Sequence, residues 1–176
     1  MINKEDLKEL ALKYLDKYQP SKKDLRIYLF KKSREIPLDN KDKTKTLEEI
    51  DDVILSLEKL GLIDDKIYSE IKSKNFLKRG YSINKIRSVL MKKGVNDNLL
   101  HRTIEGILKD NEDPDFYSAI KLCKRRGIGP YRPEANRKIF YIKDTGVLAR
   151  SGFSYEISKR VLDLGQKELK IFEKKF

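Results

Sequence analysis

Few side chains in this 176-residue chain have the types and spacing that catalysis or metal binding needs. His101 is the only histidine and Cys123 is the only cysteine. A lone histidine on a helix is usually a surface or packing residue, because acid–base and metal sites combine several such groups. Cys123 shares an apolar stripe with Ile120, so we expect a small buried side chain there. The sequence therefore predicts that the protein is not an enzyme and that it has no catalytic residue, metal site or cofactor.

Two acidic pairs and one glycine-rich stretch resemble reactive sites at first sight. The residues of each pair, Asp51-Asp52 and Asp64-Asp65, are adjacent, so the two carboxylates point to different parts of a helix surface. We interpret them as helix caps or as charges that favour the positive end of a helix dipole. The Gly-Ile-Gly stretch at 127–129 lacks the Gly-x-x-x-x-Gly-Lys-Ser/Thr pattern of a phosphate-binding loop and follows no predicted strand. No nucleotide site is predicted.

Positive charge is more informative. The chain has 40 Lys and Arg against 28 Asp and Glu, a net charge of +12, which favours a polyanion such as nucleic acid or an acidic protein surface. Basic residues gather around the glycine–proline loop at 127–133, where Tyr131 and Tyr141 are candidates for stacking on bases of a single strand. The candidate binding residues are Lys121, Lys124, Arg125, Arg126, Arg132, Arg137 and Lys138 near this loop, and Arg79, Arg87, Lys92, Lys93, Arg102 and Arg150 elsewhere.

A second interpretation is that these basic residues only complement helix dipoles. Positive charge is favourable at the C-terminal end of a helix, and Arg125 and Arg126 fit that position. Arg132, Arg137 and Lys138 do not fit it, because they precede a predicted helix or lie in its first turns. The sequence therefore favours a binding surface.

Nine apolar runs with helical spacing carry these residues, at 7–18, 25–29, 50–60, 67–77, 83–90, 99–108, 116–123, 135–142 and 157–164. Ser21, Ser82 and Ser154 are predicted N-caps, and glycines at 61, 80, 94, 127 and 152 are predicted helix stops. The segment 33–45 is rich in proline and charge and predicts a loop or a frayed helix extension. Thr46 begins a capping-box pattern that would open the third helix, and the tail from Lys167 is expected to continue the ninth.

One helix junction recurs along the chain. Tyr68-Ser-Glu-Ile71 follows an acidic pair, and Tyr117-Ser-Ala-Ile120 follows acidic residues as well. Agreement of caps, glycine stops and residue types favours true repeats over ordinary helical rhythm. We therefore predict an all-α fold, a tandem array of three three-helix repeats that stack into an elongated chain. The expected boundaries are 1–62, with an insertion at about 37–45, then 63–112, and 113–176 with a basic C-terminal tail.

In their order and spacing, several of these pieces resemble the RecX family of regulatory proteins over about residues 7–162. No single piece is diagnostic, because each is a cap-and-stop pattern. The matching pieces are Ala11 with Tyr14-Leu15 before Ser21 and Asp24-Leu25-Arg26, then Leu60-Gly-Leu-Ile-Asp-Asp65 with Tyr68, Gly80-Tyr-Ser-Ile83 with Lys93-Gly94-Val95, and Leu148-Ala-Arg-Ser-Gly-Phe-Ser-Tyr-Glu-Ile157 with Val161-Leu162.

This resemblance implies both a shape and a role. RecX proteins are bacterial modulators of the RecA recombinase, built from tandem three-helix repeats. The resemblance implies a curved array that lies in the groove of a RecA filament on single-stranded DNA and inhibits strand exchange and ATP hydrolysis. The expected partners are the RecA filament and single-stranded DNA, with weaker binding to double-stranded DNA, in homologous recombination, DNA repair and the SOS response.

The alternative is a DNA-binding protein that acts without RecA, since three-helix units with short turns also describe helix-turn-helix domains. Its best recognition helix, at 85–93, offers mainly Arg87, with Asn84 just before it, which is little for reading bases. The first residues mix charges without a long apolar stretch, and no window approaches the roughly 18 apolar residues of a membrane span. We expect a cytoplasmic monomer that does not bind membranes.

Overall fold

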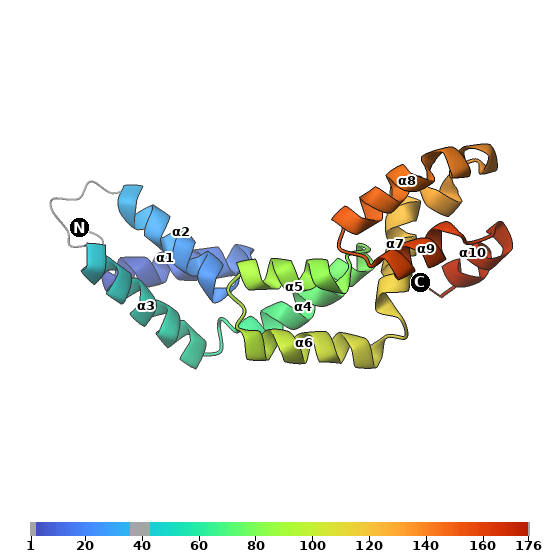
Figure 1. The fold of residues 1–176 in the computed structure, drawn as a ribbon. Helices are drawn as coiled ribbons and strands as arrows, with labels where there is room; N and C mark the ends of the chain where they lie inside the picture. Colours follow the sequence, from blue (N-terminus) through green and yellow to red (C-terminus); the bar gives the residue numbers. More distant parts are fainter. Residues whose placement is uncertain (1–2, 36–42, 176) are drawn as a thin grey trace. The chain divides into compact units, whose positions relative to one another are not determined.

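Helices form the regular structure of residues 3–35 and 43–175, the parts of the chain that this computed structural model describes (Figure 1). No strand occurs in those residues, and the predicted all-α fold is confirmed. The helices are α1 (Lys4–Lys17), α2 (Lys22–Glu35), α3 (Lys43–Lys59), α4 (Asp65–Lys78), α5 (Ile83–Lys92), α6 (Asp97–Asp110), α7 (Pro114–Arg126), the 3-10 helix η1 (Gly129–Tyr131), α8 (Glu134–Arg150), α9 (Tyr155–Leu162) and α10 (Gln166–Glu173).

The predicted caps and stops are present. The hydroxyl oxygens of Ser21, Ser82 and Ser154 each accept a hydrogen bond from the amide three residues later, at 3.1–3.2 Å. The glycines at 61, 80, 94, 127 and 152 all adopt positive φ at the ends of helices. The aromatic and apolar residues 140–142 lie within α8.

Three predicted boundaries are wrong. Helix α2 runs on through Ser33, whose hydroxyl donates to the Phe30 carbonyl oxygen inside the helix. Helix α3 begins before Thr46, which is buried within it, and residues 36–42 of the predicted insertion lie outside the described residues. The C-terminal tail does not continue α9: the Glu168 side chain accepts from the Gly165 amide at 2.9 Å and starts the separate helix α10.

The chain has two compact units, Met1–Ser69 with Lys92–Asn96, and Glu70–Met91 with Asp97–Phe176. They divide within α4 and α5, so they do not follow the predicted repeat boundaries, and the three-repeat division stays a prediction. The core of the first unit lies between α1, α2 and α3. Its buried side chains are Leu7, Ala11, Leu25, Leu29, Ile50, Val53, Ile54, Leu57 and Ile63.

The core of the second unit is formed by α7, α8 and α9 with η1 and α10. Phe172 of α10 packs edge-on against Phe116, with ring centroids 5.0 Å apart, which attaches the last helix to α7. The buried residues are Phe116, Ala119, Ile120, Leu122, Cys123, Ile128, Leu148, Phe153, Val161, Leu162, Leu164 and Leu169.

Within the first unit, the start of α2 meets the start of α4 and the turn after α5, a contact that we call the N-terminal joint. The Lys22 amide donates to the Asp65 carboxylate at 2.9 Å. Gly94 in the turn has a φ of 83°, and a Cβ there would lie 2.8 Å from the Cβ of Lys23. Only glycine fits both the backbone angle and the contact.

Within the second unit, the start of α5 meets the start of α7 and the turn after α8 in the same way, which we call the C-terminal joint. The Ile83 amide donates to the Asp115 carboxylate at 2.7 Å. Gly152 has a φ of 88°, and a Cβ there would lie 2.5 Å from the Ser82 hydroxyl oxygen. The recurring junction in the sequence thus corresponds to a recurring packing arrangement.

Candidate nucleic-acid interface

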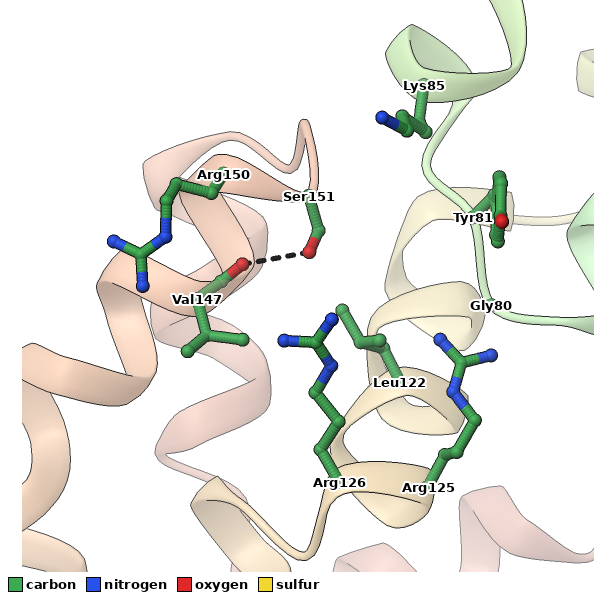
Figure 2. Close-up of a pocket in the computed structure, with 9 residues that line it drawn as sticks. All are labelled: Gly80, Tyr81, Lys85, Leu122, Arg125, Arg126, Val147, Arg150 and Ser151. Atoms are coloured by element: carbon green, nitrogen blue, oxygen red, sulfur yellow. Dashed lines mark hydrogen bonds between the residues drawn. The ribbon is translucent and has the colours of Figure 1, made fainter. Parts of the chain in front are cut away.

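A cleft of about 290 Å³ opens at the C-terminal joint (Figure 2). Four of its lining side chains are cationic and none is acidic. A concave surface lined by one sign of charge focuses its field and attracts ions of the opposite sign. The lining residues are Gly80, Tyr81, Lys85, Leu122, Arg125, Arg126, Val147, Arg150 and Ser151.

Helix α7 supplies two of these cations from its last turn. Figure 2 shows the side chains of Arg125 and Arg126 rising from the end of α7 toward the gap that Lys85 faces from α5. The Arg125 guanidinium donates to the backbone carbonyl oxygen of Arg79, in the turn after α4, and this contact orients the side chain. Because α7 ends at Gly127 with a φ of 61°, the chain turns away after the two arginines.

Ser82 links α5 to the end of α8, and these two helices form the other two walls of the cleft. Its hydroxyl donates to the Ser151 carbonyl oxygen at 2.7 Å, after the end of α8, and accepts from the Lys85 amide at 3.1 Å. The Ser151 hydroxyl in turn donates to the Val147 carbonyl oxygen at 2.8 Å, the dashed line in Figure 2. These bonds hold the backbones that carry Lys85 and Arg150 in fixed positions.

The four cations suit phosphate oxygens. A guanidinium is planar and donates two parallel hydrogen bonds to a phosphate, while a lysine ammonium acts as a compact point charge. Lys85, Arg125, Arg126 and Arg150 are all exposed, so an incoming anion reaches them without any rearrangement of the core. The cleft brings together three of the predicted binding residues.

The two lysines of the predicted α7 cluster lie in other surroundings. The Lys124 ammonium pairs with the Glu173 carboxylate of α10 at 2.8 Å. Lys121 is half-buried, and burial lowers the pKa of its ammonium. Neither side chain lines the cleft.

Arg132 has a structural role inside the second unit. Its Nε and Nη2 atoms donate to the two carboxylate oxygens of Asp144, at 2.7 and 2.9 Å, and the guanidinium lies 4.4 Å from the ring centroid of Phe140. Asp144 is 1% exposed and also accepts from the Gly129 amide at 2.9 Å. Burial alone would raise the pKa of Asp144, but the hydrogen bonds from Arg132 and Gly129 outweigh it and lower that pKa.

Arg137 and the two tyrosines also serve packing. Arg137 donates to the carbonyl oxygens of Leu162 and Leu164, at 2.8 and 2.6 Å, and so caps the end of α9. The Tyr131 hydroxyl donates to the Glu173 carboxylate, and both Tyr131 and Tyr141 pack against the core. These contacts account for the rings without base stacking, which stays a prediction.

The remaining candidates lie apart from the cleft lining. Lys93 pairs with Asp24 at 3.0 Å at the N-terminal joint. The side chains of Arg79, Arg87, Lys92, Arg102 and Lys138 are exposed on α5, α6, α8 and the turn after α4. Contact between these side chains and nucleic acid stays a prediction.

The residues that first looked reactive have ordinary partners. His101 is exposed beside Glu105, at 3.1 Å, and Cys123 is fully buried, where burial raises the pKa of its thiol to about 12. Asp51 pairs with Arg26, and Asp65 accepts from an amide at the N-terminal joint. No group of three or more His, Cys, Asp or Glu side chains arranged for a metal occurs within 3–35 and 43–175.

Sequence reasoning missed Lys85 as a cleft residue and Asp115 as the link between α5 and α7. Both follow from the joint rather than from local pattern, because Asp115 lies 32 positions from its donor. A partial signal was available: acidic residues precede both Tyr68 and Tyr117. The spacing differs, because Asp65 lies three positions before Tyr68 and Asp115 lies two positions before Tyr117, so the sequence alone does not identify which aspartate makes each link.

The chain is similar to several curated bacterial proteins. It is 28% identical over 163 residues to regulatory protein RecX of Myxococcus xanthus (strain DK1622), covering 89% of this chain and 84% of that protein. Identity is 30% over 131 residues to regulatory protein RecX of Clostridioides difficile (strain 630), which covers 71% of this chain and 59% of that protein. Identity is also 30% over 109 residues to regulatory protein RecX of Agrobacterium fabrum (strain C58 / ATCC 33970), which covers 60% of this chain and 54% of that protein.

Solved structures show the same fold. The crystal structure of RecX from Lactobacillus salivarius matches with a TM-score of 0.61 and 20% identity, over 96% of this chain and 97% of that one. A crystal structure of regulatory protein RecX matches with a TM-score of 0.60 and 21% identity, over 92% and 74%. No family model matches the chain, and none of its described helices is long and apolar enough for a membrane span. Taken with the order of caps, stops and joints, these relatives support the assignment of the chain to the RecX family of regulatory proteins.

Proposed function

We propose that this protein regulates homologous recombination and DNA repair by binding a RecA filament on single-stranded DNA. There it inhibits strand exchange and ATP hydrolysis, and it acts as a cytoplasmic monomer without catalysing a reaction. The family membership supports the regulatory role. The observation that carries the nucleic-acid half is the cleft at the C-terminal joint, with four cationic side chains and no acidic one.

The cleft supports contact with the phosphate backbone rather than readout of base sequence. Arginine and lysine bind phosphates irrespective of the base attached to them, and such contacts position a protein without selecting a sequence. Asn84, the amide side chain nearest the cleft in sequence, donates to the Gly152 carbonyl oxygen at 3.2 Å and so has a partner at the joint. Contact with the phosphate backbone alone suits a single strand of DNA that another protein coats along its length.

The ATPase rate of RecA on single-stranded DNA tests the proposal. We expect substoichiometric amounts of this protein to slow ATP hydrolysis, and the variant Arg125→Glu/Arg126→Glu to slow it much less. The matched control is Lys8→Glu/Lys17→Glu, which changes the charge equally on exposed sites of α1. If ATP hydrolysis is undiminished at every ratio while the wild type still binds DNA alone, the result favours a DNA-binding protein that acts without RecA.

A further inference from the structure

The outer face of α8 carries an apolar stripe whose two large side chains are exposed. Its members recur at alternating intervals of four and three positions: Ala135, Ile139, Ile142, Gly146 and Ala149. Ile139 is 75% exposed and Ile142 is 87% exposed, the highest values among the large apolar side chains of the described residues. Alternation of four and three is the spacing of a helix seam that packs against another helix.

The opposite face of the same helix explains why α8 is held in place. Asp144 and Leu148 are buried there, and the Arg132 guanidinium binds the Asp144 carboxylate. Arg137 ties the helix to the end of α9. The outer stripe is therefore a rigid, preformed surface, and packing within the second unit does not account for its apolar residues.

Cations border the stripe on both sides. With 3.6 residues per turn, Lys138 falls on one flank, and Lys143 and Arg150 fall on the other. The Arg150 guanidinium folds back over Gly146, 3.2 Å from where a Cβ would be. The one acidic residue on the exposed surface of α8 is Glu134, in its first turn.

We propose that this face docks an acidic amphipathic helix of a protein partner. The partner helix would place apolar side chains over Ile139 and Ile142 and carboxylates opposite the flanking cations. Ala135 and Ala149 are small and exposed, which allows the two backbones to approach closely, so the isoleucines would act as the two knobs of the contact.

The charges select this occupant over others. A second copy of the same face would bring cations against cations, which is unfavourable. A single nucleic-acid strand gains from aromatic platforms, and isoleucine offers none. Two large apolar residues are too few to hold a helix at a membrane surface. An acidic helix satisfies both the stripe and its borders.

The stripe lies next to the cationic cleft on the same helix. Val147, Arg150 and Ser151 line the cleft, while Gly146 and Ala149 belong to the stripe. A docked protein helix and a strand in the cleft would therefore be neighbours. The docking proposal goes beyond the proposed function and relies on it only for the assembly in which both contacts occur.

Nuclear magnetic resonance titration of the full chain tests the docking site directly. The probe is an 18-residue helical peptide with leucines at the same alternating spacing and glutamates on both flanks. We expect saturable shifts confined to α8, and affinity about tenfold lower for Ile139→Gln/Ile142→Gln. Leu108→Gln, on an exposed site of α6, is the matched control and should bind as the wild type does.

Three results would overturn the proposal. The first is the absence of shifts on α8, and the second is equal binding of a peptide that has the same leucines but lysines on its flanks. The third is that Ile139→Gln/Ile142→Gln changes only self-association or vesicle binding and leaves peptide binding intact. A parallel arm measures binding to RecA filaments and to single-stranded DNA alone. The double variant should lose filament binding and keep its affinity for DNA. If the wild type binds no filament, the proposed function fails while the peptide result still decides the docking site.

Discussion

The two joints of the molecule share their backbone contacts and differ in their charge. At each joint an amide at the start of one helix donates to an aspartate that opens another, and a glycine turn packs against the same helix start. At the N-terminal joint two of the cations are paired, Lys22 with Glu58 at 2.8 Å and Lys93 with Asp24 at 3.0 Å. At the C-terminal joint four cations line a cleft that has no acidic side chain.

This difference separates the contacts that stabilise the fold from the charges that are available for binding. The shared contacts satisfy buried polar groups and allow close packing, which any joint of this kind needs. The charge pattern is not required for that packing, because the first joint forms with neutralising carboxylates. We therefore propose that the cationic side chains of the cleft serve to bind an anion.

The largest expected effect tests the equivalence of the joints. Gly94→Ala and Gly152→Ala each force a Cβ into a contact of 2.5–2.8 Å at a positive φ. We expect each to lower the free energy of unfolding by about 2 kcal/mol or more, measured by urea denaturation followed by circular dichroism. If one substitution is neutral and the other is not, the joints are not equivalent.

A somewhat smaller effect is expected from the two bridging carboxylates. Asp65→Ala and Asp115→Ala each leave an amide without its acceptor, which costs about 1–3 kcal/mol. Asparagine keeps an oxygen in place, so Asp65→Asn and Asp115→Asn should retain most of the stability. Equal losses for alanine and asparagine would show that charge, rather than the hydrogen bond, matters at these positions.

The smallest effect concerns pH. Burial raises the pKa of both Asp65 and Asp115, more than the amide hydrogen bonds lower it. The folded protein therefore binds more protons than the unfolded chain just above the ordinary aspartate pKa of about 3.9, and these two groups make stability fall as pH rises through that interval.

Denaturation midpoints measured from pH 4 to 7 test this sign. In Asp65→Asn/Asp115→Asn the contribution is removed, so stability should fall less with rising pH than it does in the wild type. A steeper fall in the double variant would contradict the assignment.

Much of this architecture is visible in the sequence because its determinants are local. Ser82 caps a helix through an amide three residues away, and Gly152 stops one through its own backbone angle. The family resemblance followed from the order of such signals. The start of α10 was missed because it depends on Glu168 accepting from the Gly165 amide, a weak local pattern beside a basic tail.

The candidate site was harder to predict because its contacts span long stretches of chain. Arg125 and Arg126 were predicted as binding residues, and the structure places both in the cleft. Lys85 joins them only through the contact between Ser82 and Ser151, which are 69 positions apart. Arg132 was expected on the binding surface, yet its guanidinium holds the buried Asp144. Residue type and helix position do not distinguish a cation that faces solvent from one that faces a buried carboxylate.

The salt dependence of single-stranded DNA affinity tests the central claim most directly. Fluorescence anisotropy across a salt series compares the wild type with Arg125→Gln/Arg126→Gln and with the control Lys8→Gln/Lys17→Gln. Each phosphate contact on a single strand contributes about 0.7 to the slope of log K against log salt, so the account predicts a slope smaller by about 1.4 in the cleft variant alone. An unchanged slope and affinity, with the helical circular dichroism signal retained, would contradict it.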